Sequence, residues 1–338
     1  MDYQKLEKIL SQPKFRLKQA RHEIFVRYIS NWSEATVFPE KLREELNREC
    51  PLEIKHQLII SSDGRTAKAL IELADGLKIE AVLMRHYSDR NTLCLSSQVG
   101  CPIGCSFCAT GALGFKRNLS AEEIVDQFLI FARFLKLENE KIDNVVFMGM
   151  GEPLLNYGNV IKAIKILNDK EGINLGARSI SISTVGIASG IRDLLDFKIQ
   201  INLAFSLHAP NNRIRSKLIP SSMENDLDHL IPLLKKYVEK NKRRLMVEYV
   251  MIEKINDSDE NAKELAKLIK EISQKLCLVN LIPYNETGKF KPSSPERIEK
   301  FLEVLEKSGI KGTIRASLGS DIEGSCGQLA AKAGVFKI

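Results

Sequence analysis

Three cysteines stand in one short run of the sequence, Cys101, Cys105 and Cys108, with the spacing Cys-x3-Cys-x2-Cys. A structural zinc site closes its tetrahedron with four ligands, and a [4Fe–4S] cluster is normally held by four cysteines. Three thiolates in one loop therefore leave one iron of such a cluster open to a small molecule. The spacing predicts an enzyme whose chemistry takes place at an iron with a free coordination position.

A further reactive thiol is expected near the C-terminus, at Cys326 in the run Gly-Ser-Cys-Gly-Gln. Glycines on both sides free the backbone and keep the sulfur accessible, whereas Cys277 stands in an apolar run that is typical of a buried cysteine. Cys94 lies seven residues before Cys101, so it could also approach the site. Cys50 ends a polar helix and is assigned no role.

Composition restricts the class of protein. The chain has 338 residues, 44% of them hydrophobic, and a net charge of +7 with a pI of about 8.9, which suits a nucleic-acid partner without requiring one. The first residues are charged and polar, unlike a signal peptide, and no apolar stretch has the length of a membrane helix. Seven cysteines in such a chain indicate metal or redox chemistry in a reducing compartment. We expect a cytoplasmic protein without membrane contact.

The pattern of apolar residues predicts three regions. Residues 1–50 are expected to be helical, and their basic residues, such as Arg16, Lys18 and Arg21, form either a solvated helix face or a small RNA-docking domain. Residues 51–90 are expected to hold a short β-meander connector, with turns at Asp63-Gly64 and Asp75-Gly76. Residues 91–338 alternate strand and helix and end in a segment that carries Cys326.

Six strand–helix units in succession predict an α/β fold, a parallel sheet curling into a partial (βα)6 barrel. Ser120 and Glu123 form a capping box before a helix at 121–135. The expected strands are 144–149, 178–183, 201–207, 245–252 and 277–283, with a last short strand around Ile314, and residues 93–99 are expected as a strand or an extended entry.

Functional groups in such barrels lie where strands end and loops begin. Small or polar residues follow four of the expected strands, at Gly151-Glu152, Ser183, Ser206-Leu207-His208 and Asn285. Each alone is read more simply as a turn or capping residue. Because all four endings fall at the edge that carries the cysteine loop, we expect them to form a site with it.

Several motifs together resemble one known family. Cys101-Pro-Ile-Gly-Cys-Ser-Phe-Cys is similar to the cluster motif of radical S-adenosylmethionine enzymes. The runs Ser97-Gln-Val-Gly-Cys, Gly149-Met-Gly-Glu-Pro-Leu, Phe205-Ser-Leu-His-Ala-Pro and Ser325-Cys-Gly-Gln-Leu narrow the resemblance. With them the chain is identified as a member of the RlmN/Cfr family of RNA adenine methyltransferases, over most of its length.

The resemblance implies a set of site residues. Cys101, Cys105 and Cys108 would hold one [4Fe–4S] cluster, whose open iron binds S-adenosylmethionine. Cys326 would accept a methyl group from one cofactor molecule and have a hydrogen removed by the 5′-deoxyadenosyl radical of a second. Cys94 would release the product by a disulfide with Cys326. The positions that match cofactor contacts are Gly151, Glu152, Ser183, Ser206, Leu207, His208 and Asn285.

A radical route fits the substrate that the resemblance implies, because an electrophilic amidine carbon of adenine cannot take a methyl cation directly. Glu80 matches the family's acidic residue that acts on the adenine, although its own sequence context indicates an exposed strand residue. The expected partners are RNA, namely 23S ribosomal RNA with transfer RNA as a second candidate, and an electron donor such as flavodoxin. The enzyme is expected to be a monomer.

Basic runs offer candidate contacts for the RNA backbone. They are Lys116-Arg117 and the run of Lys240, Lys242, Arg243 and Arg244; solvated charge is the alternative for both. The target base would have to leave its stack to reach the site.

Three functions remain open. Pro153 after Glu152 resembles the branch that methylates C2 of adenine, whereas the C8-methylating branch, which confers antibiotic resistance, more often carries alanine there. Glu80 lies one residue further from Cys94 than in some C2 enzymes, which weakens this choice of branch. The alternatives are the C8 enzyme and a metal-stabilised RNA-binding protein without turnover, which would have no need of Cys326 and Cys94.

Overall fold

A ten-stranded sheet forms the centre of the molecule. The computed structural model describes residues 3–13, 15–220 and 226–330. The strands are, in spatial order, β1 (His56–Ile60), β2 (Thr66–Glu72), β3 (Lys78–Arg85), β4 (Asn91–Cys94), β7 (Asn144–Phe147), β8 (Ile180–Thr184), β9 (Asn202–Ser206), β10 (Leu245–Met251), β11 (Cys277–Pro283) and β12 (Gly312–Ile314).

The sheet changes from antiparallel to parallel at β4. Strands β1 to β4 pair antiparallel, and every neighbouring pair from β4 to β12 is parallel. Parallel strands need crossover connections, and helices provide them here. All the parallel strands therefore end at the same edge of the sheet, which is where the sequence predicts the site.

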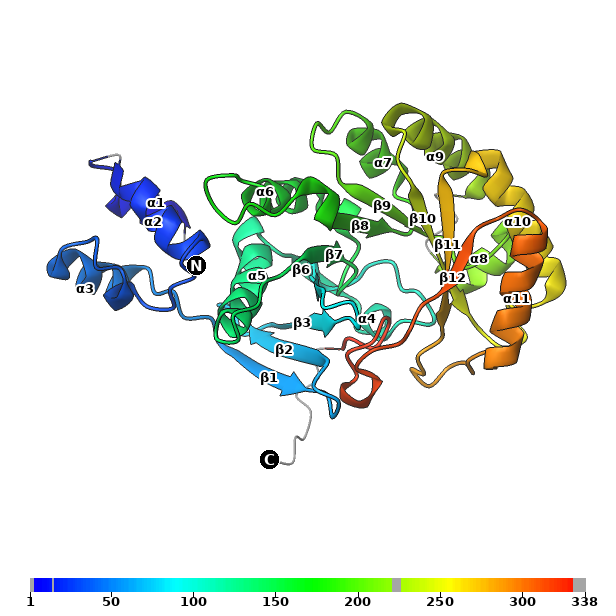
Figure 1. Ribbon diagram of the computed structural model, residues 1–338, viewed down its shortest axis with the longest axis horizontal. Helices are drawn as coiled ribbons and strands as arrows, with labels where there is room; N and C mark the ends of the chain where they lie inside the picture. The colour runs from blue at the N-terminus through cyan, green and yellow to red at the C-terminus, as the bar shows by residue number, and fades with distance from the viewer. Residues whose placement is uncertain (1–2, 14, 221–225, 331–338) are drawn as a thin grey trace.

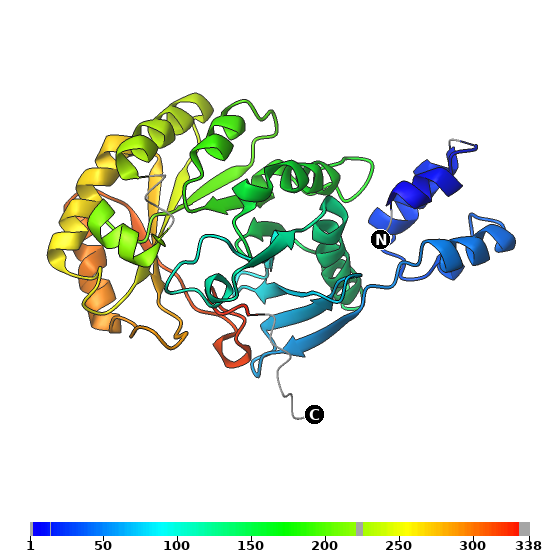
Figure 2. The same cartoon turned by 180° about the vertical axis from the view of Figure 1, so that it is seen from behind.

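Helices cover the outer side of the curved sheet, as Figures 1 and 2 show. Each of the six parallel strands from β4 to β11 is followed by at least one helix, so the predicted (βα)6 partial barrel is confirmed. These helices are α5 (Ala121–Lys136), α6 (Tyr157–Leu167), α7 (Ala188–Leu195), α8 (Asn212–Leu218), α9 (Leu227–Asn241), α10 (Asp259–Ser273) and α11 (Pro295–Lys307). Short 3₁₀ turns lie at Trp32–Glu34, Pro153–Asn156, Ala177–Ser179 and Ser320–Ile322.

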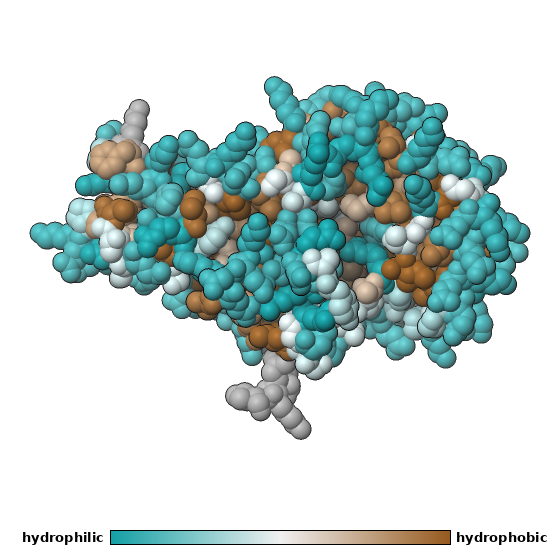
Figure 3. All heavy atoms as spheres, viewed as in Figure 1, coloured by the Kyte–Doolittle hydropathy of each residue, from teal (hydrophilic) through white to brown (hydrophobic). Residues whose placement is uncertain are grey.

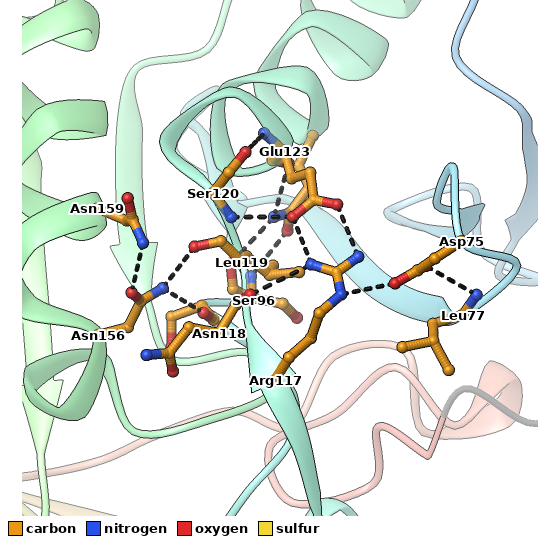
Figure 4. A network of polar contacts seen from close by, with 12 residues as sticks. Asp75, Leu77, Ser96, Arg117, Asn118, Leu119, Ser120, Glu123, Asn156 and Asn159 are labelled. Carbon is orange, nitrogen blue, oxygen red and sulfur yellow. Dashed lines mark hydrogen bonds and ion pairs between the residues drawn. The ribbon is translucent and has the colours of Figure 1, made fainter. Parts of the chain in front are cut away.

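The predicted capping box starts α5. Ser120 accepts a hydrogen bond from the Glu123 backbone N–H (3.2 Å), and the Glu123 carboxylate accepts one from the Ser120 N–H (2.9 Å). The same carboxylate accepts hydrogen bonds from both terminal nitrogens of Arg117, each at 2.8 Å (Figure 4). The Arg117 Nε also donates to Asp75 at 2.7 Å. This network ties α5 to the turn between β2 and β3.

Helices α1 (Tyr3–Ile9), α2 (Phe15–Phe25) and α3 (Glu40–Glu49) form the N-terminal unit. It packs against α5, where Arg133 donates to the carbonyls of Leu52 and Ile29. Two of its basic residues are engaged with the loop after α6. Lys18 pairs with Glu171, and Arg21 pairs with Asp169 at 2.6 Å. These exposed ion pairs connect the unit to the rest of the molecule, although surface pairs of this kind contribute little to stability.

The β-meander is an extension of the main sheet, because β3 pairs with β4 from Val82↔Cys94 to Arg85↔Asn91. Its turns contain Gly64 and Gly76, both at positive φ, as the sequence predicts. The first six residues of β2 are all buried, so both faces of this strand are covered. The division of the chain at residues 50 and 90 stays a proposal, since the first ninety residues pack directly on the rest.

The structure differs from the sequence prediction around the cysteine loop. Residues 93–99, expected as a strand or an extended entry, belong to two strands: β4 ends at Cys94, and β5 (Gln98–Gly100) pairs antiparallel with β6 (Phe115–Asn118) in a separate two-stranded sheet. The intervening Ser96 leaves the main sheet, since its hydroxyl donates to the Glu80 carbonyl and accepts from the Met150 N–H. Helices α4 (Ala109–Ala112) and α8 were not predicted.

Hydrophilic side chains cover most of the face shown in Figure 3, and apolar ones appear there in separate patches. Within the described ranges, no helix combines the length and the apolar character that a bilayer crossing requires.

Candidate active site

The cysteine loop runs from β5 to α4 and is fixed at both ends. Cys101 donates its N–H to the Gly114 carbonyl (3.0 Å), and Cys108 stands at the N-terminus of α4. Gly100 has a φ of +75°, and a Cβ there would lie 1.8 Å from the Gly114 oxygen, so only glycine fits. Helix α8 braces the loop from outside, because the Ser106 N–H donates to the Leu218 carbonyl (2.9 Å).

All three cysteines line one cavity at the carboxyl edge of the parallel strands. It holds about 960 Å³ of empty space, part of it open to solvent. The cavity also brings together most of the polar residues that the sequence assigned to the site. These are Gly151, Glu152, Ser183, Ser206, His208, Asn285 and Cys326.

The donor set fits a cluster with an open iron. Burial raises the pKa of Cys101 to about 12 and that of Cys105 well above its usual value, so iron binding must displace their protons. In the described part of the chain, no three His, Cys, Asp or Glu side chains are grouped closely enough for one metal ion. A [4Fe–4S] cluster does not need such a group, because each thiolate binds a different iron.

Glu152 lies beside the cysteine loop with a buried carboxylate. One oxygen accepts from the Leu154 N–H (3.1 Å) and the other from the Val185 N–H (2.9 Å). Burial raises the pKa of Glu152 to about 7. Gly151 before it has a φ of +100°, and a Cβ there would lie 2.5 Å from the Gln98 Cβ. The geometry presents a carboxylate that can accept from an ammonium group in the cavity.

Two hydroxyls and an amide complete the polar wall. The hydroxyls of Ser183 and Ser206, at the carboxyl ends of β8 and β9, are hydrogen-bonded to each other at 3.0 Å. Asn285 follows β11, and its side-chain amide donates to the Cys326 carbonyl at 3.0 Å. Asn285 therefore orients the segment that carries the tail cysteine.

His208 is held neutral in a strained turn. It has a φ of +57°, and its Nδ1 accepts from the Val250 N–H at 3.1 Å, so its Nε2 carries the proton. Its ring packs edge-on against Phe107, with the ring centroids 4.9 Å apart. Burial, followed by the charge of Arg215, lowers the pKa of His208 to about 3. The side chain is thus a hydrogen-bond donor at physiological pH.

A second cavity, with about 670 Å³ of empty space that is partly open to solvent, is lined by both the tail cysteine and Cys94. Cys326 and Cys108 line both cavities, and Cys94 lines the second. Burial raises the pKa of Cys94 to about 12, and the next contribution comes from the charge of Cys326. Cys326 is exposed as a residue, yet the surrounding protein withdraws its thiol from water and so raises the pKa of that thiol as well.

Arg315 is the site residue that sequence reasoning missed. It directly follows β12, lines both cavities, and its charge opposes the rise in the pKa of Cys326. The Arg315 guanidinium lies 3.4 Å from Glu248, which accepts from Asn280 (2.9 Å), and Asn280 accepts from Thr313 (2.8 Å). Its place after a parallel strand is the signal that could have found it.

Two expected site residues lie outside the lining of both cavities. Leu207 is fully buried, and its N–H donates to the Glu248 carbonyl at 3.1 Å. Glu80 is only 2% exposed, so its interpretation as an exposed strand residue is wrong. The error has a physical reason, because alternation suggests a solvent-facing side for β3 whereas the Cys326 segment covers that face.

The predicted basic runs are partly engaged within the protein. Arg117 forms the ion pairs described above, while Lys116 is exposed. Lys240 pairs with Asp196 at 2.8 Å, and Lys242 and Arg244 are exposed. This second run precedes β10, so it lies at the amino edge of the parallel strands, away from the cavities.

Fold and site together define a radical SAM protein. The model of the Radical SAM superfamily matches residues 95–266, a range that includes the cysteine loop, Glu152 and His208. The crystal structure of a radical SAM methyltransferase from Sphaerobacter thermophilus is 42% identical, covers 97% of each chain and has a TM-score of 0.92.

Two relatives are similar over nearly their whole length. One from Dictyoglomus turgidum, named "Probable dual-specificity RNA methyltransferase RlmN", is 44% identical over 322 residues, or 95% of this chain and 91% of the relative. One from Nitrosopumilus maritimus, named "Ribosomal RNA large subunit methyltransferase N", is 41% identical over 340 residues, or 97% and 95%. The chain therefore belongs to the RlmN family of radical SAM methyltransferases, as the sequence motifs predicted.

Proposed function

We propose that this protein methylates C2 of an adenosine in RNA, using two molecules of S-adenosylmethionine per turnover. Large-subunit ribosomal RNA is the proposed substrate, with transfer RNA as the second. The relatives' names support this, since one is named for ribosomal RNA of the large subunit and another as a dual-specificity RNA methyltransferase. We infer a cytoplasmic monomer that receives electrons from a donor such as flavodoxin.

One observation carries the proposal: Cys326 lines a cavity with the three cysteines and a second cavity with Cys94. A methyl carrier needs access to the cofactor and to a second thiol that can release it. A protein that only binds RNA needs neither arrangement. This favours the enzyme over the binding module.

When bound, the cluster would supply the electron that cleaves the cofactor's sulfonium bond. Cys101, Cys105 and Cys108 would hold it. Glu152 would accept from the cofactor's ammonium group, and His208, Ser183, Ser206 and Asn285 would orient the cofactor. The Cys326 thiolate would attack the sulfonium methyl, with Arg315 stabilising the anion. At release, the Cys94 thiolate would bond to the Cys326 sulfur as the bond from that sulfur to the transferred carbon breaks, and the electron pair of the broken bond, with a proton, would complete the new methyl group on the RNA.

The test is anaerobic reconstitution of the full chain followed by nucleoside mass spectrometry. We expect 5′-deoxyadenosine only when a reductant is present, and 2-methyladenosine in the RNA. Cys105→Ala is the control that lacks one cluster ligand and should give neither product. Methylation by the Cys105→Ala variant would overturn the radical route, and 8-methyladenosine in place of 2-methyladenosine would assign the chain to the C8 reaction.

The assigned role of Cys94 has its own test. A Cys94→Ala variant should accumulate a covalent protein–RNA link through Cys326, detected as a shifted band that RNase removes. The absence of any link in an otherwise active variant would remove that role.

A further inference from the structure

The segment that carries Cys326 is held at both ends by one buried ion pair on the sheet. Lys68 of β2 and Glu80 of β3 lie diagonally on the same face of adjacent strands, and the Lys68 Nζ is 3.1 Å from the Glu80 Oε1. The two side chains are 5% and 3% exposed. A pair of charges withdrawn from water to this extent requires further hydrogen bonds.

The main chain around Cys326 provides them. The Lys68 Nζ donates to the Glu323 carbonyl (3.4 Å), and the Glu80 Oε2 accepts from the Ala330 N–H (2.8 Å). The first residue of the segment 323–330 is therefore hydrogen-bonded to Lys68 and the last to Glu80, and Cys326 lies between them. We define these residues as the carrier segment.

Contacts from the opposite side fix the middle of the carrier segment to the cysteine loop. The Ala109 N–H donates to the Gly327 carbonyl (2.7 Å), and the Thr110 hydroxyl donates to the Leu329 carbonyl (2.6 Å). Both donors directly follow Cys108. The carrier segment thus spans from the Lys68–Glu80 pair to the cysteine loop.

We infer that Lys68 is a positioning residue for the methyl carrier, and that the Lys68–Glu80 pair clamps the carrier segment so that Cys326 faces both cavities. The inference rests on the proposed function for the carrier role of Cys326, but the clamp itself is a property of the fold. In this clamp, Glu80 has a structural role, which is to accept the hydrogen bond from the Ala330 N–H.

Loss of either charge leaves the other buried without its partner, so the end of the carrier segment should detach. Hydrogen bonds to charged groups contribute enough for their loss to speed local opening by about 10-fold or more. The Ala330 amide reports this directly, because its proton is the one donated to Glu80.

The experiment is amide hydrogen exchange of the reconstituted full chain, read by mass spectrometry on peptides from residues 323–330, with the methyl content of Cys326 measured after incubation with S-adenosylmethionine. We expect Lys68→Met to raise the exchange rate about 10-fold and to lower the methyl content. Lys68→Arg keeps the charge and should restore both. Asp259→Asn, which removes the Arg297–Asp259 pair elsewhere, is the matched control and should change neither.

If Lys68→Met fails to fold, the double variant Lys68→Met/Glu80→Gln removes both charges and gives the same readout. The clamp is overturned if exchange in these variants stays as in the wild type. It is also overturned if Glu80→Gln stops RNA methylation with unchanged exchange and unchanged Cys326 methylation, since Glu80 would then act on the adenine alone. If the wild type never methylates Cys326, but the variants still exchange faster than the wild type as expected, the proposed function is refuted and the clamp stands.

Discussion

The tail thiol lies among charges that decide its reactivity. Burial raises the pKa of Cys326, Arg315 lowers it, and Glu248 raises it. Glu248 also holds the Arg315 guanidinium in place. The balance keeps the pKa of the thiol above its usual value, with a cation beside it that favours the thiolate.

Removing that cation should make the thiol less acidic. In Arg315→Met, we expect the pKa of Cys326 to rise, because the attractive charge is lost while the burial remains. The measurement is the rate of Cys326 alkylation by iodoacetamide as a function of pH, followed by peptide mass spectrometry. Lys311→Met changes an exposed charge at the other end of β12 and should leave the curve in place. If the alkylation curve of Arg315→Met is identical to that of the wild type, Arg315 does not lower the pKa of Cys326.

His208 should stay neutral far below the usual histidine range. Its pKa is lowered from 6.5 to about 3, so the native state rejects a proton that the unfolded chain accepts. The stability associated with the neutral ring is therefore present above pH 6.5 and is lost as pH falls toward 3, at about 1.4 kcal/mol per pH unit. With only five histidines, ¹⁵N-histidine NMR can follow it, and we expect the Nε2–H tautomer at pH 5. A midpoint near pH 6.5 for His208 would refute this.

At the scale of elements, the repeating units could be predicted from sequence because each carries its own signal. Buried parallel strands such as β10 are apolar enough to recognise, and α5 begins at a capping box. The missed elements are short: α4 has four residues, and α8 has seven. Their positions depend on contacts with distant segments, such as the Ser106–Leu218 bond, which no local pattern contains.

The site could likewise be predicted where its residues lie in recognisable elements, and not where it depends on distant segments. Polar residues at strand ends could be found because topology brings those ends together. The burial of Glu80 and the role of Arg315 depend on the course of the chain after β12, which passes Arg315 and reaches β3 through the carrier segment. Periodicity within β3 cannot indicate that a distant segment covers it.

Arg117 should act on stability rather than on RNA. It bridges β6, α5 and the β2–β3 turn through Glu123 and Asp75, and those contacts raise the pKa of its own guanidinium. We expect Arg117→Gln to lower the free energy of unfolding by about 1 kcal/mol, since the bridge is partly solvent-exposed. Denaturant unfolding is the measurement, and Lys116→Gln is the neighbouring control. A stable Arg117→Gln protein with weakened RNA binding would reverse the assignment.

At the scale of the molecule, the positive charge is spread around the structure. Exposed Lys242 and Arg244 lie at the amino edge of the sheet, and Lys18 and Arg21 are engaged by acidic residues. Net charge alone therefore does not mark the surface that faces RNA. The surface next to the cavities includes the carrier segment and the loop after β11.

The continuity of β3 with β4 has a consequence for dividing the chain. A protein beginning at residue 91 would lose the partner of Leu93 and Cys94, and a bare strand edge invites pairing with other copies. We expect residues 91–338 to aggregate on expression, whereas residues 51–338 keep that edge covered; size-exclusion chromatography distinguishes the two. A monomeric 91–338 would show that the parallel half folds by itself. If residues 91–338 aggregate as expected, the meander and the parallel half fold only as one cooperative unit.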